Sequence, residues 1–504
     1  MKLLENFEKY LLYAAVAVFP VFFLLNSSAP AVFPKAELLF VVGAVLIILW
    51  LVKIVVKGSV SFASGKFDIG VLLLAIGYLL STIFRTPNKM EAFLIPGTTT
   101  FVLLGAIFYF LANQLDKKSK LNLEIAYFIS GLFLSLCLIL ARIGFFTKIP
   151  QLPLAVKDIG FNPLGGSIPA GLYLIPALFA GAALALKDKE IVKRTFWTIA
   201  EAVILMAAVI LIGQSLPGKP QYPRLPGFAA TWEVAVQTLA KSPVFGVGPA
   251  NYLTAFDQFR PVSYNSTDLW QVKFTTAADF YLTLLTETGL LGLFGLVVLL
   301  IGVYKAFAKD PKNVEKMSLV ALIIALALLP ASPVIIIPLF IVLSLVSSSE
   351  ADVKSTAFNP KFLAYIFSAL ILGGIGIAAF YGAKMALAEA DFAGSLDALT
   401  KNDGKTTFDL MQKAVNQNPQ VDRYHASLAQ VDMALAQSLA SKKDITPADK
   451  TTITQLVQAA INEGKATVVL NPGRSGNWEL LAGIYKSIMP FAQGADQFAV
   501  QTYT

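Results

Sequence analysis

Residues 275–295 read TTAADFYLTLLTETGLLGLFG, and they open an apolar run that continues to about residue 304. Asp279, Thr283 and Glu287 recur every four residues, which places them on roughly one face of a helix. Three glycines follow at intervals of three, a spacing that lets a second helix approach closely. A carboxylate inside a bilayer is costly and usually faces a wet cavity or a partner. The stretch therefore predicts a membrane helix whose polar face belongs to a site.

The composition of the whole chain indicates a membrane protein. Of its 504 residues, 56% are hydrophobic and only 14% are charged, whereas a soluble domain carries roughly a quarter charged residues. A short pair of apolar runs is interrupted by Pro330 and Pro333, which predicts a kinked or re-entrant pair of helices. In total, the apolar runs predict an all-α polytopic bundle of about eleven transmembrane helices. They lie near residues 10–26, 36–56, 68–85, 98–114, 123–146, 167–186, 195–214, 280–304, 315–330, 333–348 and 360–383.

Basic residues in the short loops indicate how this bundle lies in the membrane. Cytoplasmic loops carry an excess of Lys and Arg, so we expect the four lysine-rich loops inside the cell. The long loop 215–275 and the C-terminal region then lie on the outer side of the cytoplasmic membrane. The net charge of +8 resides mostly in the basic loops and implies no nucleic-acid partner. The lysine-rich loops are 53–66, 117–120, 187–194 and 305–316.

The scarcity of cysteine and histidine restricts the chemistry of the protein. Cys137 is the only cysteine, which excludes an intrachain disulfide and a cysteine-based metal site. His425 is the only histidine, so a histidine-ligated metal centre is also unexpected. We expect neither a metal nor a cofactor.

The apolar runs stop at about residue 385, which predicts a membrane domain of residues 1–384 and a C-terminal domain of residues 385–504. Two segments of the second domain resemble each other, because a ring-bearing residue follows proline by six positions in both. These residues are His425 and Trp478, each followed by leucine and alanine. The pattern resembles the tetratricopeptide repeat, in which such positions interlock two antiparallel helices. His425 is then a packing residue, and a continuation of the natural chain beyond the second repeat is left open.

The loop 215–275 is expected to carry two amphipathic helices, one around Trp232 and one around Phe256. They would lie on the outer leaflet or over the mouth of the bundle. Between them, Gly246 and Gly248 predict a tight turn where the backbone passes close to another segment. A phosphate-binding loop is the less favoured interpretation of this lone pair of glycines.

Part of the chain resembles the superfamily of O-antigen ligases and O-antigen polymerases. The resemblance covers about residues 230–295 and rests on Trp232, Pro243, the Gly-Val-Gly turn and the run YLTLLTETGLLG from Tyr281. It implies a metal-independent membrane glycosyltransferase that acts in the assembly of envelope polysaccharide or glycoconjugates. Such an enzyme transfers a glycan from an undecaprenyl-diphosphate donor to a hydroxyl acceptor. The implied partners are this lipid-linked donor, membrane lipid and a protein bound by the repeats.

The same resemblance implies where the site lies. The histidine that serves as base in the ligases is replaced here by Ala278, and Asp279 follows it as a substitute base or as a helix N-cap. Loop arginines of the family stabilise the diphosphate, but one of these positions is Phe228. The remaining loop cations also fit solvated charges or headgroup contacts, and Glu287 also fits a buried hydrogen-bonding role. The catalytic candidates are Asp279 and Arg260, and the substrate-binding candidates are Arg224, Trp232, Lys273 and Glu287.

Two other classes of function stay open. Ala278 and Phe228 also fit a catalytically inactive relative that binds envelope glycan or holds a partner through its repeats. A flippase for lipid-linked sugars, or another transporter, is the third interpretation. Transporters often carry broken helices in both halves of the chain, whereas the expected breaks here cluster at Pro330 and Pro333. Arg85, at the outer end of an apolar run, is explained by snorkelling toward the membrane surface.

Overall fold

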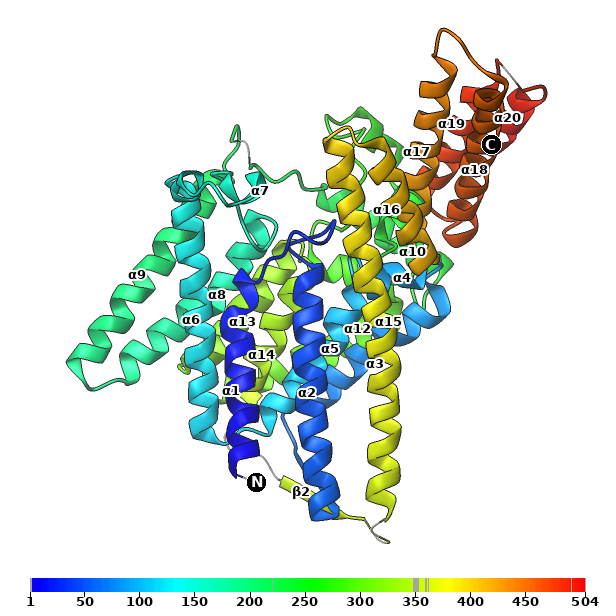
Figure 1. Ribbon diagram of the computed structural model, residues 1–504. Helices are drawn as coiled ribbons and strands as arrows, with labels where there is room; N and C mark the ends of the chain where they lie inside the picture. The colour runs from blue at the N-terminus through cyan, green and yellow to red at the C-terminus, as the bar shows by residue number, and fades with distance from the viewer. Residues whose placement is uncertain are drawn as a thin grey trace.

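The structure is a computed structural model that describes residues 2–219, 221–347, 353–358, 360, 362–490 and 492–503. These residues form helices and one small antiparallel sheet, in which β1 (Ser59–Ala63) pairs with β2 (Val353–Ala357). The sheet and the N-terminus lie at one end of the molecule, and the C-terminal helices lie at the other (Figure 1). The predicted all-α class is therefore confirmed.

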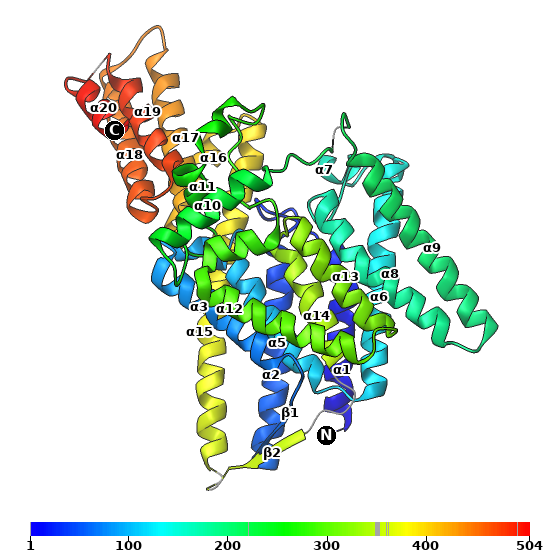
Figure 2. The same cartoon turned by 180° about the vertical axis from the view of Figure 1, so that it is seen from behind.

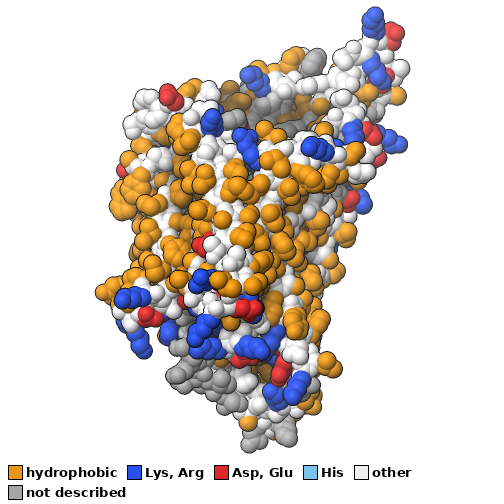
Figure 3. All heavy atoms as spheres, turned by 90° about the vertical axis from the view of Figure 1, so that its left-hand side faces the viewer, with side chains coloured by type: hydrophobic (Ala, Val, Ile, Leu, Met, Phe, Trp, Pro, Cys, Tyr) orange, Lys and Arg blue, Asp and Glu red, His pale blue; other side chains and the backbone are white. Residues whose placement is uncertain are grey.

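Eight helical segments in the described residues are long and apolar enough to cross a membrane. On the face that Figure 3 shows, hydrophobic side chains form a broad band across the middle of the molecule, as a membrane protein requires. Three shorter helices overlap the other predicted spans, namely α1 (Lys2–Val18), α13 (Val314–Leu328) and α14 (Ile336–Ser347). The first predicted span, residues 10–26, is wrong in its second half, because α1 ends at Val18. The eight segments are α2 (Phe33–Lys57), α3 (Asp68–Arg85), α4 with α5 (Lys89–Phe93 and Thr98–Asn113), α6 (Lys117–Arg142), α8 (Ser167–Lys187), α9 (Ile191–Gln214), α12 (Phe280–Lys309) and α15 (Phe362–Thr400).

The prolines interrupt the helices where the sequence predicts. Helix α13 ends at Leu328, and a short 3-10 turn, η4 (Pro333–Ile335), leads into α14. The carbonyl freed at Leu329 accepts a hydrogen bond from Phe280 N at 3.1 Å. The interruption thus lies beside the start of α12, and the two backbone groups, Leu329 O and Phe280 N–H, pair with each other where a bilayer would offer no partner.

Helices α3 and α12 lie side by side with their backbones in contact (Figure 2). Glycines make this possible, because a Cβ atom on Gly77 would lie 3.1 Å from the Cα atom of Gly292. A Cβ atom on Gly295 would lie 2.6 Å from Leu74 N. The close approach predicted from the glycine spacing is confirmed, and its partner is α3.

The long loop contains two helices, α10 (Phe228–Lys241) and α11 (Tyr252–Phe259), which confirms the predicted pair. The buried face of α10 consists of Thr231, Val234, Ala235 and Thr238. Trp232 is 52% exposed on the other face, where its ring stacks on Phe228. Of the apolar positions that mark this helix in the sequence, Trp232 and Val236 are therefore exposed, whereas Ala235 is buried.

The C-terminal region consists of consecutive helix pairs. Helix α15 runs without a break from Phe362 to Thr400, so the expected boundary at residue 385 falls inside one helix. Its apolar first part is largely exposed, and its last part packs against α16 (Gly404–Gln417). Two further pairs follow, α17 (Asp422–Ala440) with α18 (Pro447–Leu470) and α19 (Ser475–Ile488) with α20 (Ala495–Tyr503).

Buried polar contacts fasten these pairs to the membrane helices. Glu389 in α15 is 1% exposed and accepts hydrogen bonds from Ser28 N at 2.8 Å and from the Tyr424 hydroxyl at 2.6 Å. Arg474, between α18 and α19, lies 2.5 Å from a carboxylate oxygen of Glu91 in α4. The C-terminal helices are therefore seated on the bundle rather than tethered to it.

Candidate functional site

Helix α12 is broken at Gly289, where the backbone adopts φ 62° and ψ −155°. The connection between α10 and α11 is inserted at the break and replaces the lost helical hydrogen bonds. Val247 N donates to Thr286 O at 3.0 Å, and Leu290 N donates to Pro243 O at 2.8 Å. Since unpaired backbone groups are costly in a bilayer, this loop is an integral part of the helix. Two motifs that are about 40 residues apart in the sequence thus form one structure.

Two glycines of the inserted loop are required for its contacts with the neighbouring helices. Gly246 has φ 62°, and a Cβ atom there would lie 2.2 Å from Thr286 O. Gly248 has φ 92°, and a Cβ atom there would lie 2.5 Å from Thr86 N. Both positions combine a left-handed backbone with a contact that excludes any side chain. The tight turn predicted here is confirmed, and the segments it meets are α12 and the end of α3.

Glu287 is buried beside the break and is only 4% exposed. Its Oε1 atom accepts a hydrogen bond from Ala250 N at 3.0 Å. Its Oε2 atom has no hydrogen-bond partner among the described residues. The side chain thus holds the inserted loop against α12, in agreement with the hydrogen-bonding role considered from the sequence.

Asp279 caps the N-terminus of α12, because its side chain accepts a hydrogen bond from Leu282 N at 2.9 Å. The Thr283 hydroxyl donates to Asp279 O and accepts from Ala277 N, each at 2.9 Å. Burial raises the pKa of Asp279, while the backbone N–H groups of Leu282 and Tyr281 oppose that shift. The carboxylate is 4% exposed, and Ala278 beside it carries no titratable group.

The other sequence candidates have separate surroundings. Arg260 donates to Trp270 O at 3.3 Å and lies over the Tyr264 ring, so it braces the segment after α11. Lys273 binds Glu479 and Ser475 of α19, at 3.0 Å and 3.1 Å. Trp232 is exposed on α10, and Arg224 is exposed in the segment before α10. Among the described contacts, none joins Asp279 or Glu287 to these cations.

A cavity of about 170 Å³ lies beside the inserted loop, between the end of α3 and helices α10 and α11. Arg85 and Lys241 line it, and Arg85 Nε also donates to Gly246 O at 3.3 Å. Thr238 and Asn251 also line this cavity, and their Oγ1 and Oδ1 atoms are buried and lack a hydrogen-bond partner within the described part of the chain. The cavity therefore combines positive charge with unused hydrogen-bonding capacity, which suits an anionic group.

No local pattern in the sequence indicates this cavity. Arg85 at the end of an apolar run fits snorkelling, and Lys241 is one of several basic residues in the loop. The turn at Gly246 carried the missing signal, because it brings the end of α3 against the loop. Within the described residues, no group of three His, Cys, Asp or Glu side chains is placed to hold a metal ion.

Comparison with known protein families and with curated proteins finds no match to this chain. The fold and the site define a polytopic helical membrane protein in which a loop is seated in a broken helix.

Proposed function

We propose that the protein is a membrane glycosyltransferase of the O-antigen ligase and polymerase type. It transfers a glycan from an undecaprenyl-diphosphate donor to the hydroxyl group of an acceptor. The observation that carries this proposal is the insertion of residues 242–250 at the break in α12. This insertion joins the two motifs on which the sequence resemblance depends, and it builds a cationic cavity beside them.

In this proposal the donor diphosphate occupies the cavity lined by Arg85 and Lys241. The diphosphate gains negative charge as it leaves the sugar, and preorganised cations stabilise that charge best in a site with little water. Thr238 and Asn251 add hydrogen bonds to the bound oxygens. Arg260, favoured from the sequence, is already engaged with Trp270 and Tyr264, so we assign it to the support of the loop.

Transfer also requires that the acceptor hydroxyl lose its proton. Its oxygen forms the new bond to the anomeric carbon, and the diphosphate departs with the electron pair of the old bond. Asp279 is the proposed base, because its carboxylate occupies the position next to that of the family histidine. The raised pKa of this carboxyl favours proton uptake.

The proposal includes a topology of eleven spans, with α10, α11 and tetratricopeptide-like C-terminal repeats on the outer face of the inner membrane. The lysine-rich end then faces the cytoplasm. Cysteines introduced at Ser266 and Ser441, in a chain whose Cys137 is replaced by alanine, should react with an impermeant maleimide in intact cells. Reaction only after lysis would reverse this orientation.

Reconstituted protein, an undecaprenyl-diphosphate oligosaccharide and candidate acceptors provide the test. Arg85→Ala with Lys241→Ala should lower transfer by roughly 10²–10³-fold, and Asp279→Asn should lower it by roughly 10²–10⁴-fold. Asparagine still caps a helix, so Asp279→Asn separates proton transfer from stability. Arg142→Ala is the matched control, because this exposed arginine at the end of α6 lines none of the described cavities.

Three results would contradict parts of the assignment. Unchanged transfer in all of these variants would remove the site. Loss of transfer in Arg260→Ala, with full transfer in Arg85→Ala, would return the diphosphate to Arg260. Absence of transfer with retained glycan binding would favour the second candidate, a catalytically inactive scaffold. That candidate draws on Ala278 and on Phe228, whose ring stacks on Trp232 where the family has a cation.

A further inference from the structure

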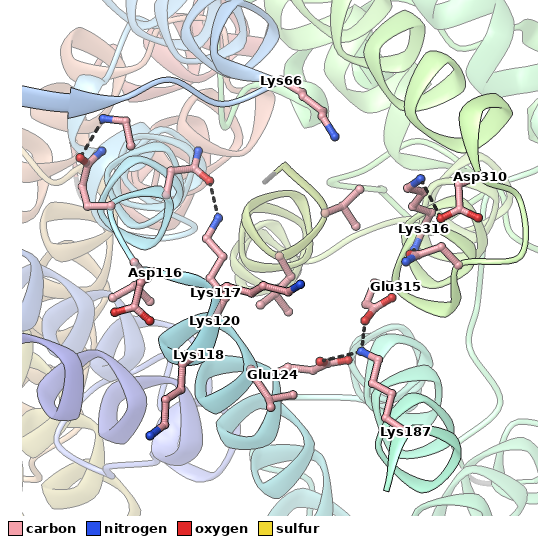
Figure 4. Close-up of a pocket in the computed structure, with 18 residues that line it drawn as sticks. Lys66, Asp116, Lys117, Lys118, Lys120, Glu124, Lys187, Asp310, Glu315 and Lys316 are labelled. Atoms are coloured by element: carbon pink, nitrogen blue, oxygen red, sulfur yellow. Dashed lines mark hydrogen bonds and ion pairs between the residues drawn. The ribbon is translucent and has the colours of Figure 1, made fainter. Parts of the chain in front are cut away.

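A larger cavity lies at the opposite end of the bundle from the proposed glycan site and shares no lining residue with it. Its volume is about 1040 Å³, and residues from all four lysine-rich loops line it. Four carboxylates and six lysines surround the space (Figure 4). The lysines are Lys66, Lys117, Lys118, Lys120, Lys187 and Lys316.

The carboxylates are already paired with particular cations. Glu315 forms an ion pair with Lys187, and Asp310 lies 3.4 Å from Lys316. Asp116 is 2.7 Å from Lys9, which belongs to α1. The fourth carboxylate, Glu124, is 3.6 Å from Lys187. Each carboxylate of the cavity wall is therefore already close to a lysine. The other lysines of the wall have no carboxylate paired with them among the described contacts.

Two lysines point into the open space without a described partner. Lys66 enters from the connection between β1 and α3, and Lys117 enters from the first turn of α6 (Figure 4). Lys118 points away, and buried Lys120 donates instead to Asn113 Oδ1 at 3.2 Å and to Ser344 O at 2.9 Å. Burial, followed by repulsion from Lys316 and Lys309, lowers the pKa of Lys66. An anion placed between the two free lysines would relieve this repulsion.

Two further features of the wall indicate the kind of anion. The N-terminal turns of α6 and α13 both line the cavity, and the positive ends of helix dipoles favour negative charge. Glu124 is 5% exposed, and its Oε1 atom has no hydrogen-bond partner in the described residues. A buried carboxylate oxygen of this kind requires a donor. These features favour a ligand that carries both a negative charge and a hydroxyl group.

We propose that this cavity binds a phosphate ester that carries a hydroxyl group, with the phosphate held by Lys66 and Lys117 and the hydroxyl donated to Glu124. The cavity is large enough for a small organic phosphate or for a lipid headgroup with the start of its chains. Its apolar wall includes Leu121 and Leu345. Two sources supply this chemistry, namely the phosphoglycerol headgroup of a membrane lipid and a soluble polyol phosphate.

Binding to purified full-length protein tests the proposal in two arms. Native mass spectrometry compares phosphatidylglycerol with phosphatidylcholine, and calorimetry measures glycerol 3-phosphate. Replacement of Lys66 and Lys117 by glutamine should weaken binding in the responding arm by roughly tenfold or more. The matched control replaces Lys189 and Lys312 by glutamine, because these exposed lysines lie in the same set of loops but do not line the cavity.

Each result decides the matter. Preference for phosphatidylglycerol that is lost only in the Lys66 and Lys117 variant supports a lipid headgroup in the site. Binding of glycerol 3-phosphate with the same dependence supports a soluble ligand. Equal losses in both double variants would reduce the effect to the general charge of this end of the molecule and overturn the proposal. Absence of binding in both arms would overturn it as well. A thermal melt of each variant verifies that the comparison is made between folded proteins.

Discussion

Gly246 has a left-handed backbone conformation and packs directly against the carbonyl of Thr286. Both features require glycine at this position. Gly246→Ala places a Cβ atom where only 2.2 Å is available, and we expect a loss of about 2 kcal/mol or more in stability. Gly213→Ala in α9 is the matched control, because its Cβ atom would meet nothing within 4 Å. Alanine is favoured over glycine in a helix, so this control should be neutral or stabilising.

Thermal stability of the two proteins in detergent is the measurement. A melting temperature of Gly246→Ala equal to that of the wild type would show that the loop is not seated against α12 as described.

At the residue scale, the sequence reveals backbone requirements better than it reveals side-chain clusters. The glycines near the end of the quoted stretch and the Gly-Val-Gly turn could be identified because glycine has few uses other than close approach and unusual backbone angles. Arg85 and Lys241 could not be paired in the same way. Their proximity depends on how the end of α3 meets α10, and no local pattern records that distance.

At the scale of elements, the α17–α18 pair contains a buried titratable cluster. Asp432 is 1% exposed, and burial, followed by the charge of Glu463, raises its pKa from 3.8 to about 7. The ring of His425 contacts the same Glu463 through Nδ1, and a proton on its Nε2 is donated to Pro419 O at 2.9 Å. Burial opposes protonation of His425, but the bonds to Glu463 and to Pro419 O outweigh it and raise the pKa.

Both shifts give the same dependence of stability on pH. The folded pair binds protons more tightly than the unfolded chain, so its stability falls as the pH rises through the folded pKa values. Between pH 5 and pH 8 we expect a loss of about 2–4 kcal/mol in the stability of this pair. Hydrogen exchange of α17 and α18 in the full chain, corrected for the intrinsic rate, measures it. Asp432→Asn should flatten the profile, and a profile that stays as steep in this variant would exclude Asp432 as its source.

The internal similarity predicted from sequence has a structural counterpart in these helix pairs. Trp478 Nε1 donates to Pro472 O at 2.8 Å, and His425 Nε2 lies 2.9 Å from Pro419 O. The two rings therefore occupy equivalent local positions, although Trp478 is 39% exposed and interlocks less than expected. The spacing between proline and ring could be recognised in the sequence because it lies within one short segment. The burial of each ring could not, because it depends on how the neighbouring helix pair packs.

At the scale of the whole molecule, Arg474 links the C-terminal helices to the bundle. It lies 2.5 Å from Glu91 and 3.3 Å from Asp422. Arg474→Ala leaves two buried carboxylates without this cation, at an expected cost of about 3–5 kcal/mol. Hydrogen exchange in α17 and α19 should rise in the full-length protein, while the membrane helices keep their protection. Lys465→Ala, an exposed position on α18, is the matched control, and equal exchange in both variants would contradict the anchoring role.

The class of the molecule could be predicted from composition, and the lysine-rich loops do gather at one end, where they share a cavity. The seating of the C-terminal helices could not be predicted. It depends on single contacts such as the one between Arg474 and Glu91, which are 383 positions apart in the chain. An isolated Arg or Glu residue does not reveal its partner, whereas lysines that recur in successive loops indicate that these loops lie on the same side of the membrane.

Helix α15 has 39 residues, so it is about 58 Å long, nearly twice the thickness of a hydrocarbon core of roughly 30 Å. A single continuous helix thus extends from the lysine-rich end of the bundle to the C-terminal helix pairs. A helix that is too long or too short for its bilayer changes its tilt, and Glu389 near the far end moves with it. Because Glu389 is bonded to Ser28 and to Tyr424, any such change of tilt acts directly on the contacts that seat the C-terminal helices on the bundle.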